Sequence, residues 1–588
     1  MSPFRLGGPM LASAGGFSAA GLAAWLLFVL LMVGYGLGSH GLIEPDEGRN
    51  AEVAREMATT NNYVLPHLNG LPYLDKPVLY FAAVAVSIEA FGPNEFAARL
   101  PSLLLGLATA GLVGWFALRR WGRDAAAVAV TASIAAPLAL GLSRVVIMDT
   151  MLSFFVVLAL VCFFVATEHR VGSSSWSVAR RRWLAWTVVG WAAIGLGVLT
   201  KGPVAIAIPL LVATPFAIRR RAVLAVWHPL GPAVMLVVVL PWVWAVSREI
   251  PNFLHYVVVT ETWARMTTDE LRRTEPIWFF LPVLLIGAFP WSILLLSDVR
   301  SKMIPDAPDD RWVRLYLWLW VILPLVFFSL SRGKQEQYVL PLVPAVALLI
   351  ASRSGGRLKG VRVAAATWAL LGLVALVYGA LGVPGLDSSR VSATAAVRTA
   401  VAFGVVAMIG ALVAGFGSTT RRAFVVVGLA LPLVMFPVVS AGLMKQVAAS
   451  RSTRDLAAEI DDHLAPNTRL LWIEEYAPGL SFYLERPIPL ASDDGDELRS
   501  NYILRNAGLF LDDDGPLRPL SSAERAVAAC SGSLIFLLGS RNEDFASVVE
   551  SSGVPRLMET RKWTAFGPDC VRQSEPTLGA GTEEEVVD

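Results

Sequence analysis

Charged residues are scarce in this sequence. Only 16% of the 588 residues are Asp, Glu, Lys or Arg, and 55% are apolar, whereas an ordinary soluble domain carries about 25% charge. The deficit extends over most of the chain, which excludes a single soluble globular protein and indicates a polytopic membrane protein. The net charge of +2 says little by itself, because the positions of the charges matter more than their sum.

Cysteine is also rare, and a cleavage site for a signal peptide is missing. The three cysteines, Cys162, Cys530 and Cys570, match no metal-binding spacing. Cys530 and Cys570 could form a disulfide in an oxidising compartment, and two reduced buried thiols are an equally good interpretation. The first apolar run, 22–38, is longer than the core of a signal peptide and no small-residue cleavage pattern follows it, so we expect a retained anchor.

Long apolar runs, by contrast, are abundant. A spanning helix needs about 20 mainly apolar residues. Thirteen stretches are candidates for spans: 18–38, 98–118, 124–142, 147–168, 183–200, 203–218, 223–247, 277–297, 313–331, 336–352, 362–383, 399–417 and 422–443. A further apolar stretch, 78–92, is short and carries Glu89, so it is either a span or a helix that lies in the membrane interface.

The basic loops decide between these two topologies. If 78–92 does not cross the membrane, five basic segments all fall on the cytoplasmic side, as the positive-inside rule requires. These segments are 119–123, 168–182, 219–221, 353–362 and 420–422. If 78–92 crosses, all five face outside. We therefore predict thirteen spans in a transmembrane domain over 1–443, a cytoplasmic amino terminus, and a first external loop at 39–97 with interfacial helices.

The carboxyl-terminal part of the chain has a different character. Between 444 and 572, short apolar runs such as 470–475 and 533–539 alternate with helical and turn-rich stretches, which predicts a small external α/β domain. The tail, 573–588, ends in "EEEVVD" and has a composition typical of disorder.

Unusual polar residues gather in the predicted external loops. "EPDEGRNAEVAREM" (44–57) begins a polar helix with Asp46 and Arg49, and "PYLDKP" brings Asp75 and Lys76 together. Further such residues are Asp149 in "SRVVIMDT", Lys201 in "LTKGP", Glu275 in "RRTEP", and Lys334 and Tyr338 in "SRGKQEQYVLP".

Each of these residues has a simpler explanation when it is taken alone. A loop charge is usually solvated, Lys201 and Lys334 could extend to the membrane interface, and an exposed Asp46–Arg49 pair would contribute little. Asp149 is harder to dismiss because it lies at the edge of an apolar run, where an ionisable group is costly and usually functional. Together, acids and bases at lipid depth fit a ligand with an anionic head and an apolar tail. Lysine and arginine would bind a phosphate, and a carboxylate would act on a hydroxyl or an amine.

A series of sequence blocks in fixed order adds a family resemblance. The blocks are "EPDEGRNAEVAREM", "LPYLDKPVLYF", "EFAARLPSLLLG", "IMDTMLSFF", "LTKGPVAIAIP", "FFLPVLLIGAFPW" and "SRGKQEQYVLPLVPAVALL". Together they resemble the C-type superfamily of membrane glycosyltransferases, in the bacterial branch of the aminoarabinose lipid A transferase and the protein O-mannosyltransferase relatives. The resemblance runs from about residue 20 to 355.

The resemblance implies a polyprenyl-phosphate-linked sugar as donor and an inverting transfer at the external face of a bacterial inner membrane. The acceptor would be lipid A, another envelope glycan or lipid, or a protein hydroxyl, and no nucleic-acid partner is expected. Asp46 matches the family's essential aspartate, and Asp149 matches a second acid of the same cavity. The residues matched to donor-phosphate binding are Lys76, Arg49, Lys334, Lys201 and Tyr338.

Two positions depart from the family pattern. Asp75 stands where glutamate is expected, and Glu275 stands where relatives often carry histidine. Both positions could bear on a divalent metal ion, so they are the weak metal candidates of this chain and no metal is required by the sequence.

Two other classes of protein share some of these features. A transporter or flippase for an anionic polyprenyl lipid would also have many spans and charges at membrane depth. Transporters commonly contain repeats related by symmetry, and no such halves are recognisable in this sequence. A non-catalytic envelope-assembly factor on the same fold is the third possibility.

Overall fold

The computed structural model describes residues 16–171, 176–257, 275–299, 310–353, 360–381, 391–529 and 533–568. The chain divides into two compact units. The first comprises Met1–Leu68 and Pro72–Ser452, and the second comprises Asn69–Leu71 and Thr453–Asp588. The second unit therefore begins at Thr453 and not at the predicted 444, because helix α22 (Ala441–Ala449) packs against α19 and α21 of the first unit.

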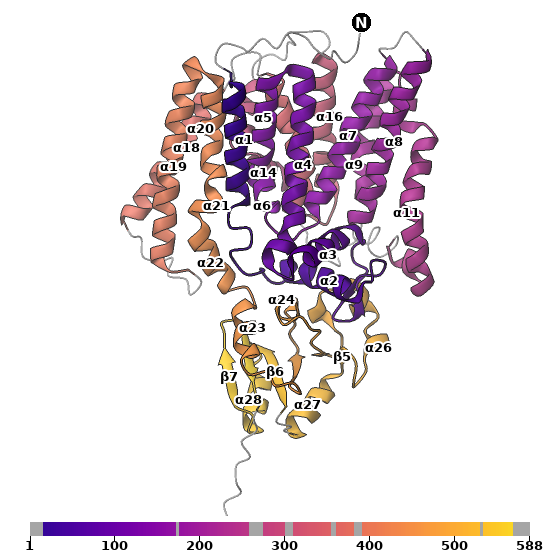
Figure 1. The fold of residues 1–588 in the computed structure, drawn as a ribbon, viewed down its shortest axis with the longest axis vertical. Helices are drawn as coiled ribbons and strands as arrows, with labels where there is room; N and C mark the ends of the chain where they lie inside the picture. Colours follow the sequence, from indigo (N-terminus) through magenta and orange to yellow (C-terminus); the bar gives the residue numbers. More distant parts are fainter. Residues whose placement is uncertain are drawn as a thin grey trace, which may run out of the picture. The chain divides into compact units, whose positions relative to one another are not determined.

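The first unit is a bundle of long apolar helices (Figure 1). Eight helical stretches in the described ranges are long and apolar enough to cross a membrane. They are α4 (Glu95–Trp121), α7 (Asp149–Val171), α8 (Trp176–Lys201), α10 and α11 (Leu224–Trp227, Leu230–Glu249), α16 (Asp310–Leu330), α18 (Val361–Leu381), α19 (Ala393–Thr420), and α20 and α21 (Arg422–Val434, Phe436–Val439). A ninth span results if α14 (Phe280–Gly287) and α15 (Trp291–Val299), bent by 110°, are taken as one.

The other predicted spans correspond to shorter helices. These are α1 (Ala19–Gly34), α5 with α6 (Arg123–Ile134, Pro137–Leu142), α9 (Val204–Arg219), and the 3-10 helix η2 with α17 (Glu336–Leu342, Val343–Ala351). Each falls short of the about 20 continuous helical residues that a span needs, so the count of thirteen stays a prediction. Helix α3 (Leu79–Phe91) is shorter still, at 13 residues.

The centre of the bundle is built around α7. In the most apolar part of this helix, 83% of the residues are buried inside the protein. Tyr316 of α16 donates a hydrogen bond of 2.7 Å to the carbonyl of Leu160, which lies on α7. Helices at the periphery keep large apolar side chains exposed, as Val237 on α11 and Leu381 on α18 show with exposed fractions of 73% and 70%. Such surfaces suit contact with lipid and confirm the predicted polytopic helical membrane fold.

Helix α2 (Asp46–Thr60), the hairpin β1–β2 (His67–Leu68, Leu71–Pro72) and α3 make up the first long loop. Its first residues fold around Arg99, near the start of α4. The guanidinium donates to the carbonyls of Leu37, His40 and Gly41 at 2.9–3.1 Å. It also forms two bonds of 2.8 Å to the Glu47 carboxylate. This buried pair fixes where α2 begins.

The second unit is a mixed α/β domain. Its six-stranded sheet has the order β5-β4-β3-β6-β8-β7, in which β5, β4, β3 and β6 are parallel and β8 runs antiparallel to β6 and β7. The strands are β3 (Arg469–Ile473), β4 (Leu490–Ala491), β5 (Leu517–Arg518), β6 (Leu534–Gly539), β7 (Arg556–Glu559) and β8 (Trp563–Phe566). Helices α27 (Leu520–Ala529) and α28 (Glu543–Ser551) share a buried core with the sheet, and α23 (Arg454–Asp461) packs against α24 (Pro478–Tyr483).

Strands β3 and β6 coincide with the two apolar runs that predicted this domain, and they pair directly, with Arg469 opposite Leu534. Asn69, from the hairpin tip, belongs to this unit, where its side-chain oxygen accepts a hydrogen bond of 3.0 Å from the Ile488 amide. The predicted Cys530–Cys570 disulfide and the tail 573–588 lie outside the described residues. Cys162 is a buried free thiol on α7.

Candidate functional site

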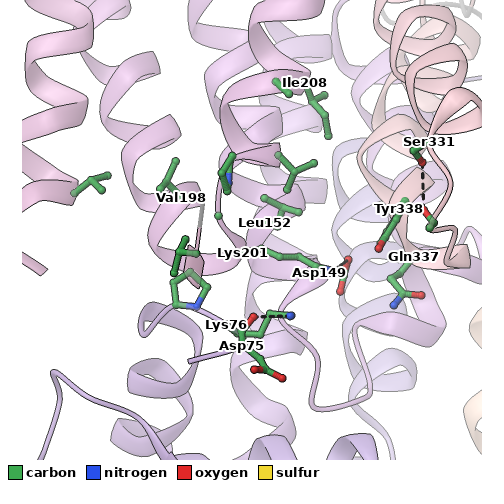
Figure 2. Close-up of a pocket in the computed structure, with 18 of the residues that line it drawn as sticks. Asp75, Lys76, Asp149, Leu152, Val198, Lys201, Ile208, Ser331, Gln337 and Tyr338 are labelled. Carbon is green, nitrogen blue, oxygen red and sulfur yellow. Dashed lines mark hydrogen bonds and ion pairs between the residues drawn. The ribbon is translucent and has the colours of Figure 1, made fainter. Parts of the chain in front are cut away.

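A cavity of about 370 Å³ lies in the first unit, where α7 begins, α8 ends and α9 begins. Its polar wall includes Asp75, Lys76, Asp149, Lys201, Ser331, Gln337 and Tyr338. Its apolar wall includes Leu152, Val198, Ile208, Val239 and Phe253. Figure 2 shows Leu152, Val198 and Ile208 beyond Lys201 and away from Lys76 and Asp75, so the cavity has a polar part and an apolar part. It suits an amphiphile with an anionic head.

The centre of the polar part is the ion pair between Asp149 and Lys201. The Lys201 ammonium lies 2.6 Å from the Asp149 carboxylate, and the two side chains are only 13% and 3% exposed. Asp149 is the first residue of α7 and Lys201 is the last residue of α8. A helix dipole favours an acid at the first position and a cation at the last, so both helix ends support the charges they carry.

The same lysine also contacts an aromatic ring. The Lys201 ammonium lies 5.3 Å from the ring centroid of Tyr338, within the range of a cation–π interaction. Gly202, with a φ of +90°, follows directly, and a residue with a side chain rarely adopts this backbone conformation. Gly202 therefore ends α8 at Lys201, which places this lysine just before the start of α9.

Asp75 and Lys76 reach the cavity from the first loop. The Tyr256 hydroxyl donates to the Asp75 carboxylate at 2.7 Å, and the Lys76 ammonium donates to the backbone carbonyl of Asp75 at 2.6 Å. Tyr256 is only 6% exposed. Asp75 is therefore held by a buried tyrosine from the segment after α11, while Lys76 extends along the cavity wall.

The segment 331–338 forms another part of the wall, through Ser331, Gly333, Gln337 and Tyr338. Lys334 lies within this segment but is not among the lining residues. Its ammonium is buried and donates to the carbonyl of Ser331 at 2.6 Å. Lys334 therefore stabilises the turn at 331–334 from the side that does not line the cavity. Its predicted contact with a phosphate would require a different side-chain position.

Asp46 and Arg49 form an ion pair of 2.6 Å at the start of α2, and neither is among the residues that line the cavity. The Asp46 side chain is 72% exposed, whereas that of Arg49 is 16% exposed. Burial by itself lowers the pKa of Arg49, but Tyr73 and the carboxylates of Asp46 and Asp75 together raise it above its ordinary value. Arg49 thus links the exposed Asp46 electrostatically to Asp75 on the cavity wall.

Of the predicted site residues, the structure brings Asp75, Lys76, Asp149, Lys201 and Tyr338 together around one cavity. It leaves Asp46, Arg49 and Lys334 outside the lining, and their assigned roles stay predictions. Glu275 is exposed and does not line the cavity. Among the described residues, no group of three or more His, Cys, Asp or Glu side chains could hold a metal ion. The metal candidacy of Asp75 and Glu275 is an untested prediction.

Three residues of this site were missed by the sequence analysis. Tyr256 lies in the segment "PNFLHYVVV", whose apolar character gave no signal. Trp242 lines the cavity from α11 and donates to the carbonyl of Val64 at 2.8 Å, which ties this helix to the first loop. Gln337 lies within the block "SRGKQEQYVLP", and the spacing could not tell which of its polar side chains faces the cavity.

Burial also separates two adjacent acids of α2. Asp46 is exposed, but the Glu47 carboxylate accepts two hydrogen bonds of 2.8 Å from Arg99 and one of 3.0 Å from each of the amides of Ile43 and Val146. Burial by itself raises the pKa of Glu47, yet Arg99 and these hydrogen bonds hold it below its ordinary value. Glu47 is therefore a structural carboxylate that stays ionised, and Asp46 is the acid of this pair that solvent can reach.

Comparison with known proteins agrees with this geometry. The sequence model of the dolichyl-phosphate-mannose-protein mannosyltransferase family matches residues 49–257. An undecaprenyl phosphate-α-4-amino-4-deoxy-L-arabinose arabinosyl transferase of Pseudomonas savastanoi pv. phaseolicola is 32% identical over 485 residues, which cover 79% of this chain and 85% of the relative. The enzyme of the same name from Aeromonas salmonicida is 32% identical over 370 residues, which cover 60% of this chain and 65% of the relative, just under two thirds of its length.

A solved structure covers nearly the whole chain. The crystal structure of ArnT from Cupriavidus metallidurans bound to undecaprenyl phosphate superposes with a TM-score of 0.79 at 26% identity, over 93% of this chain and 98% of that protein. The resemblance that the sequence blocks indicated is thereby confirmed. This chain belongs to the C-type superfamily of membrane glycosyltransferases, in the family that contains the bacterial aminoarabinose transferases.

Proposed function

We propose that this protein transfers a sugar from an undecaprenyl-phosphate-linked donor to an acceptor at the outer face of the bacterial inner membrane. The observation that carries the proposal is the cavity in which Lys76, Lys201 and Tyr338 adjoin an apolar wall. The related structure that holds undecaprenyl phosphate supports the same ligand class. The basic segments 119–123, 168–182 and 219–221 support an orientation with these turns in the cytoplasm and the second unit in the periplasm.

The donor's phosphate would lie among Lys76, Lys201 and the Tyr338 hydroxyl, with the prenyl chain along Leu152 and Ile208. An ammonium group has three donors, so Lys201 can keep its contact with Asp149 while it binds a phosphate oxygen. Negative charge grows on that oxygen as its bond to the anomeric carbon breaks. Cations placed beforehand around the leaving oxygen stabilise this transition state, each by a factor of about 10²–10³ in rate.

The acceptor would attack the anomeric carbon from the opposite face, which inverts the configuration. Asp46, exposed at the start of α2, is the proposed group that meets the acceptor. If the acceptor is a hydroxyl, Asp46 takes its proton as the new bond forms. If the acceptor is an ionised phosphate, no base is needed, and Asp46 orients the acceptor or offsets the positive character of the sugar.

The test uses the purified full chain in detergent with a panel of radiolabelled undecaprenyl-phosphate sugars and envelope lipids or glycoproteins as acceptors. We expect label transfer with the wild type and its loss with Asp46→Asn, Lys76→Gln and Lys201→Gln. The matched control is Arg220→Gln, which removes a cation at the other end of the bundle.

An alternative outcome would refute the proposal. If the protein binds undecaprenyl phosphate but transfers no sugar, and if it moves a fluorescent polyprenyl phosphate across proteoliposomes, it is a flippase and not a transferase. If the protein does transfer sugar, mass spectrometry of envelope lipids and glycoproteins from a strain without the gene identifies the acceptor, because one class would lose the mass of one sugar.

A further inference from the structure

The second unit contains a cavity of its own, of about 350 Å³, at the beginning of β3 and β6. Three arginines from separate segments line it: Arg469, the first residue of β3; Arg486, from the loop before β4; and Arg518, on β5. Ser522 of α27 lies in the same wall. The remaining wall is mainly apolar, with Leu470, Leu471, Leu534 and Ala526 among its residues. The wall of this cavity therefore combines three guanidinium groups with apolar side chains.

Two polar atoms in this wall are buried without a hydrogen-bond partner among the described residues. They are Nη2 of Arg486 and Oγ of Ser522. The other terminal nitrogen of Arg486 makes only a long contact of 3.5 Å with the carbonyl of Thr468. Burial lowers the pKa of Arg486, and Asp461 opposes this effect. Buried polar atoms in proteins nearly always have a partner, so these two donors indicate a group that the cavity receives.

The arginines of this cavity differ from other arginines of the same unit. Arg525 pairs with Asp513 at 2.7 Å, and Arg556 pairs with Glu550 at 2.7 Å and with Glu559. Within the described part of the chain, Arg469, Arg486 and Arg518 have no ion pair with an acid. Guanidinium groups that share one cavity repel each other, and an anion bound among them would remove this repulsion.

We propose that this cavity of the second unit binds the phosphate group of a phosphorylated sugar or lipid headgroup. Arginine forks match phosphate oxygens in pairs, and the Ser522 hydroxyl supplies a further donor. Free phosphate fills only a small part of a cavity of about 350 Å³, whose size is typical of sites for small organic molecules. The apolar wall would contact the organic part of the ligand.

The experiment is isothermal titration calorimetry on the purified full-length protein in detergent. Glucose 1-phosphate and inorganic phosphate are titrated in separate experiments. We expect glucose 1-phosphate to bind more tightly than inorganic phosphate, with an affinity that falls as salt rises. Binding should weaken at least tenfold in the double variant Arg486→Gln/Arg518→Gln and severalfold in Ser522→Ala. Arg525→Gln is the matched control, because it removes a cation from the same helix as Ser522 but outside the cavity, and its affinity should stay within twofold.

Nanodiscs distinguish the two sources of the phosphate. If the protein binds phosphatidic acid in phosphatidylcholine nanodiscs but not glucose 1-phosphate, and if the cavity variants lose this binding, the ligand is a lipid phosphate. The proposal is overturned if neither probe binds, or if Arg525→Gln weakens binding as much as the cavity variants. Ser522→Ala keeps the test valid if the double variant fails to fold, because the hydroxyl it removes supports no hydrogen bond in the described fold.

Discussion

At the end of the bundle where α4 and α9 finish, two ion pairs have side chains that are 12–31% exposed, whereas at the end where α4 begins two other ion pairs have side chains that are 0–13% exposed. We call these the basic end and the cavity end. At the basic end, Arg120 lies 3.5 Å from Asp310, with exposed fractions of 19% and 31%, and Arg220 lies 2.8 Å from Glu168, with exposed fractions of 12% and 14%. The Arg220 guanidinium also lies over the ring of Trp312, at 4.6 Å from its centroid.

The cavity end places similar residue types in a different environment. Glu47 pairs with Arg99 and Asp149 with Lys201, at 2.8 and 2.6 Å, and all four side chains are at most 13% exposed. A partly exposed pair contributes about 0–1 kcal/mol, whereas losing one partner of a buried pair costs about 3–5 kcal/mol. The Arg120–Asp310 pair should therefore tolerate substitution, whereas loss of one partner from either pair at the cavity end should be costly.

The largest expected effect concerns Lys201. Lys201→Gln should lower kcat/KM for sugar transfer about a thousandfold, at the upper end of the range for removing one electrostatic donor, because it also leaves the buried Asp149 without its partner. Arg220→Gln at the basic end should leave kcat/KM within threefold. Steady-state transfer assays with both variants measure the contrast, and equal losses at the two ends would contradict it.

A large effect on stability is expected at Glu47. Glu47→Gln should lower the free energy of unfolding by about 3–5 kcal/mol, because Arg99 stays buried without its counter-charge. Asp310→Asn, which removes the partner of Arg120 in the more exposed pair of the basic end, should cost less than about 1 kcal/mol. Thermal unfolding in detergent provides the comparison. Because the pKa of Glu47 is held below its ordinary value, its contribution should be present at neutral pH and be lost as the pH falls through that lowered pKa.

An intermediate effect is expected at Tyr256. Tyr256→Phe should lower kcat roughly tenfold, because a hydrogen bond to a charged group contributes about 1.5–3 kcal/mol and the Asp75 carboxylate would lose its donor. KM should change little, since the residues proposed to bind the donor lipid, Lys76 and Lys201, are unchanged in this variant. Tyr316→Phe removes a hydroxyl that bonds Leu160 inside the bundle and should affect thermal stability alone. A change in KM without a change in kcat would show that Tyr256 does not position Asp75.

The smallest effect is a dependence of stability on pH at Glu52. This carboxylate is fully buried in α2 and bonds Arg55 through both oxygens at 2.7 Å. Burial raises its pKa to about 8, Glu56 adds to the rise, and Arg55 opposes it. The contribution of Glu52 to stability is thus fully present below its ordinary pKa of 4.5 and is lost as the pH rises through about 8.

Thermal unfolding between pH 5 and 9 tests this dependence. The difference in melting temperature between the wild type and Glu52→Gln should change by a few degrees over this range in favour of the variant at high pH. A difference that stays constant with pH would show that Glu52 does not titrate there.

Much of the fold followed from the sequence. The charge deficit and the long apolar runs predicted the helical membrane unit, and the runs at 470–475 and 533–539 predicted the sheet of the second unit. The number of spans was less accessible, because helices such as α5 and α6 are interrupted between Ile134 and Pro137. A hydropathy average over the sequence does not detect such a break, because the residues on both sides of it are apolar.

The site was only partly predictable. Asp149 and Lys201 stood out because each interrupts or ends an apolar run, and both line the cavity. Lys334 and Tyr338 belong to the same block, and only the second lines it. Tyr256 had no charge and no motif to distinguish it. Proximity to a motif shows that a segment approaches the site, but not which side chain of the segment faces it.

Asp46 and Glu47 show what the sequence determines and what only the tertiary structure decides. The sequence by itself determined that a polar helix with two acids follows the first apolar run, because composition and the helix-start signal are local properties. Only the tertiary structure decided that Glu47 is buried and Asp46 is exposed, because Arg99, the partner of Glu47, is distant in the chain. Neighbouring residues of a helix point in different directions, and their environments depend on what the rest of the chain packs against each face.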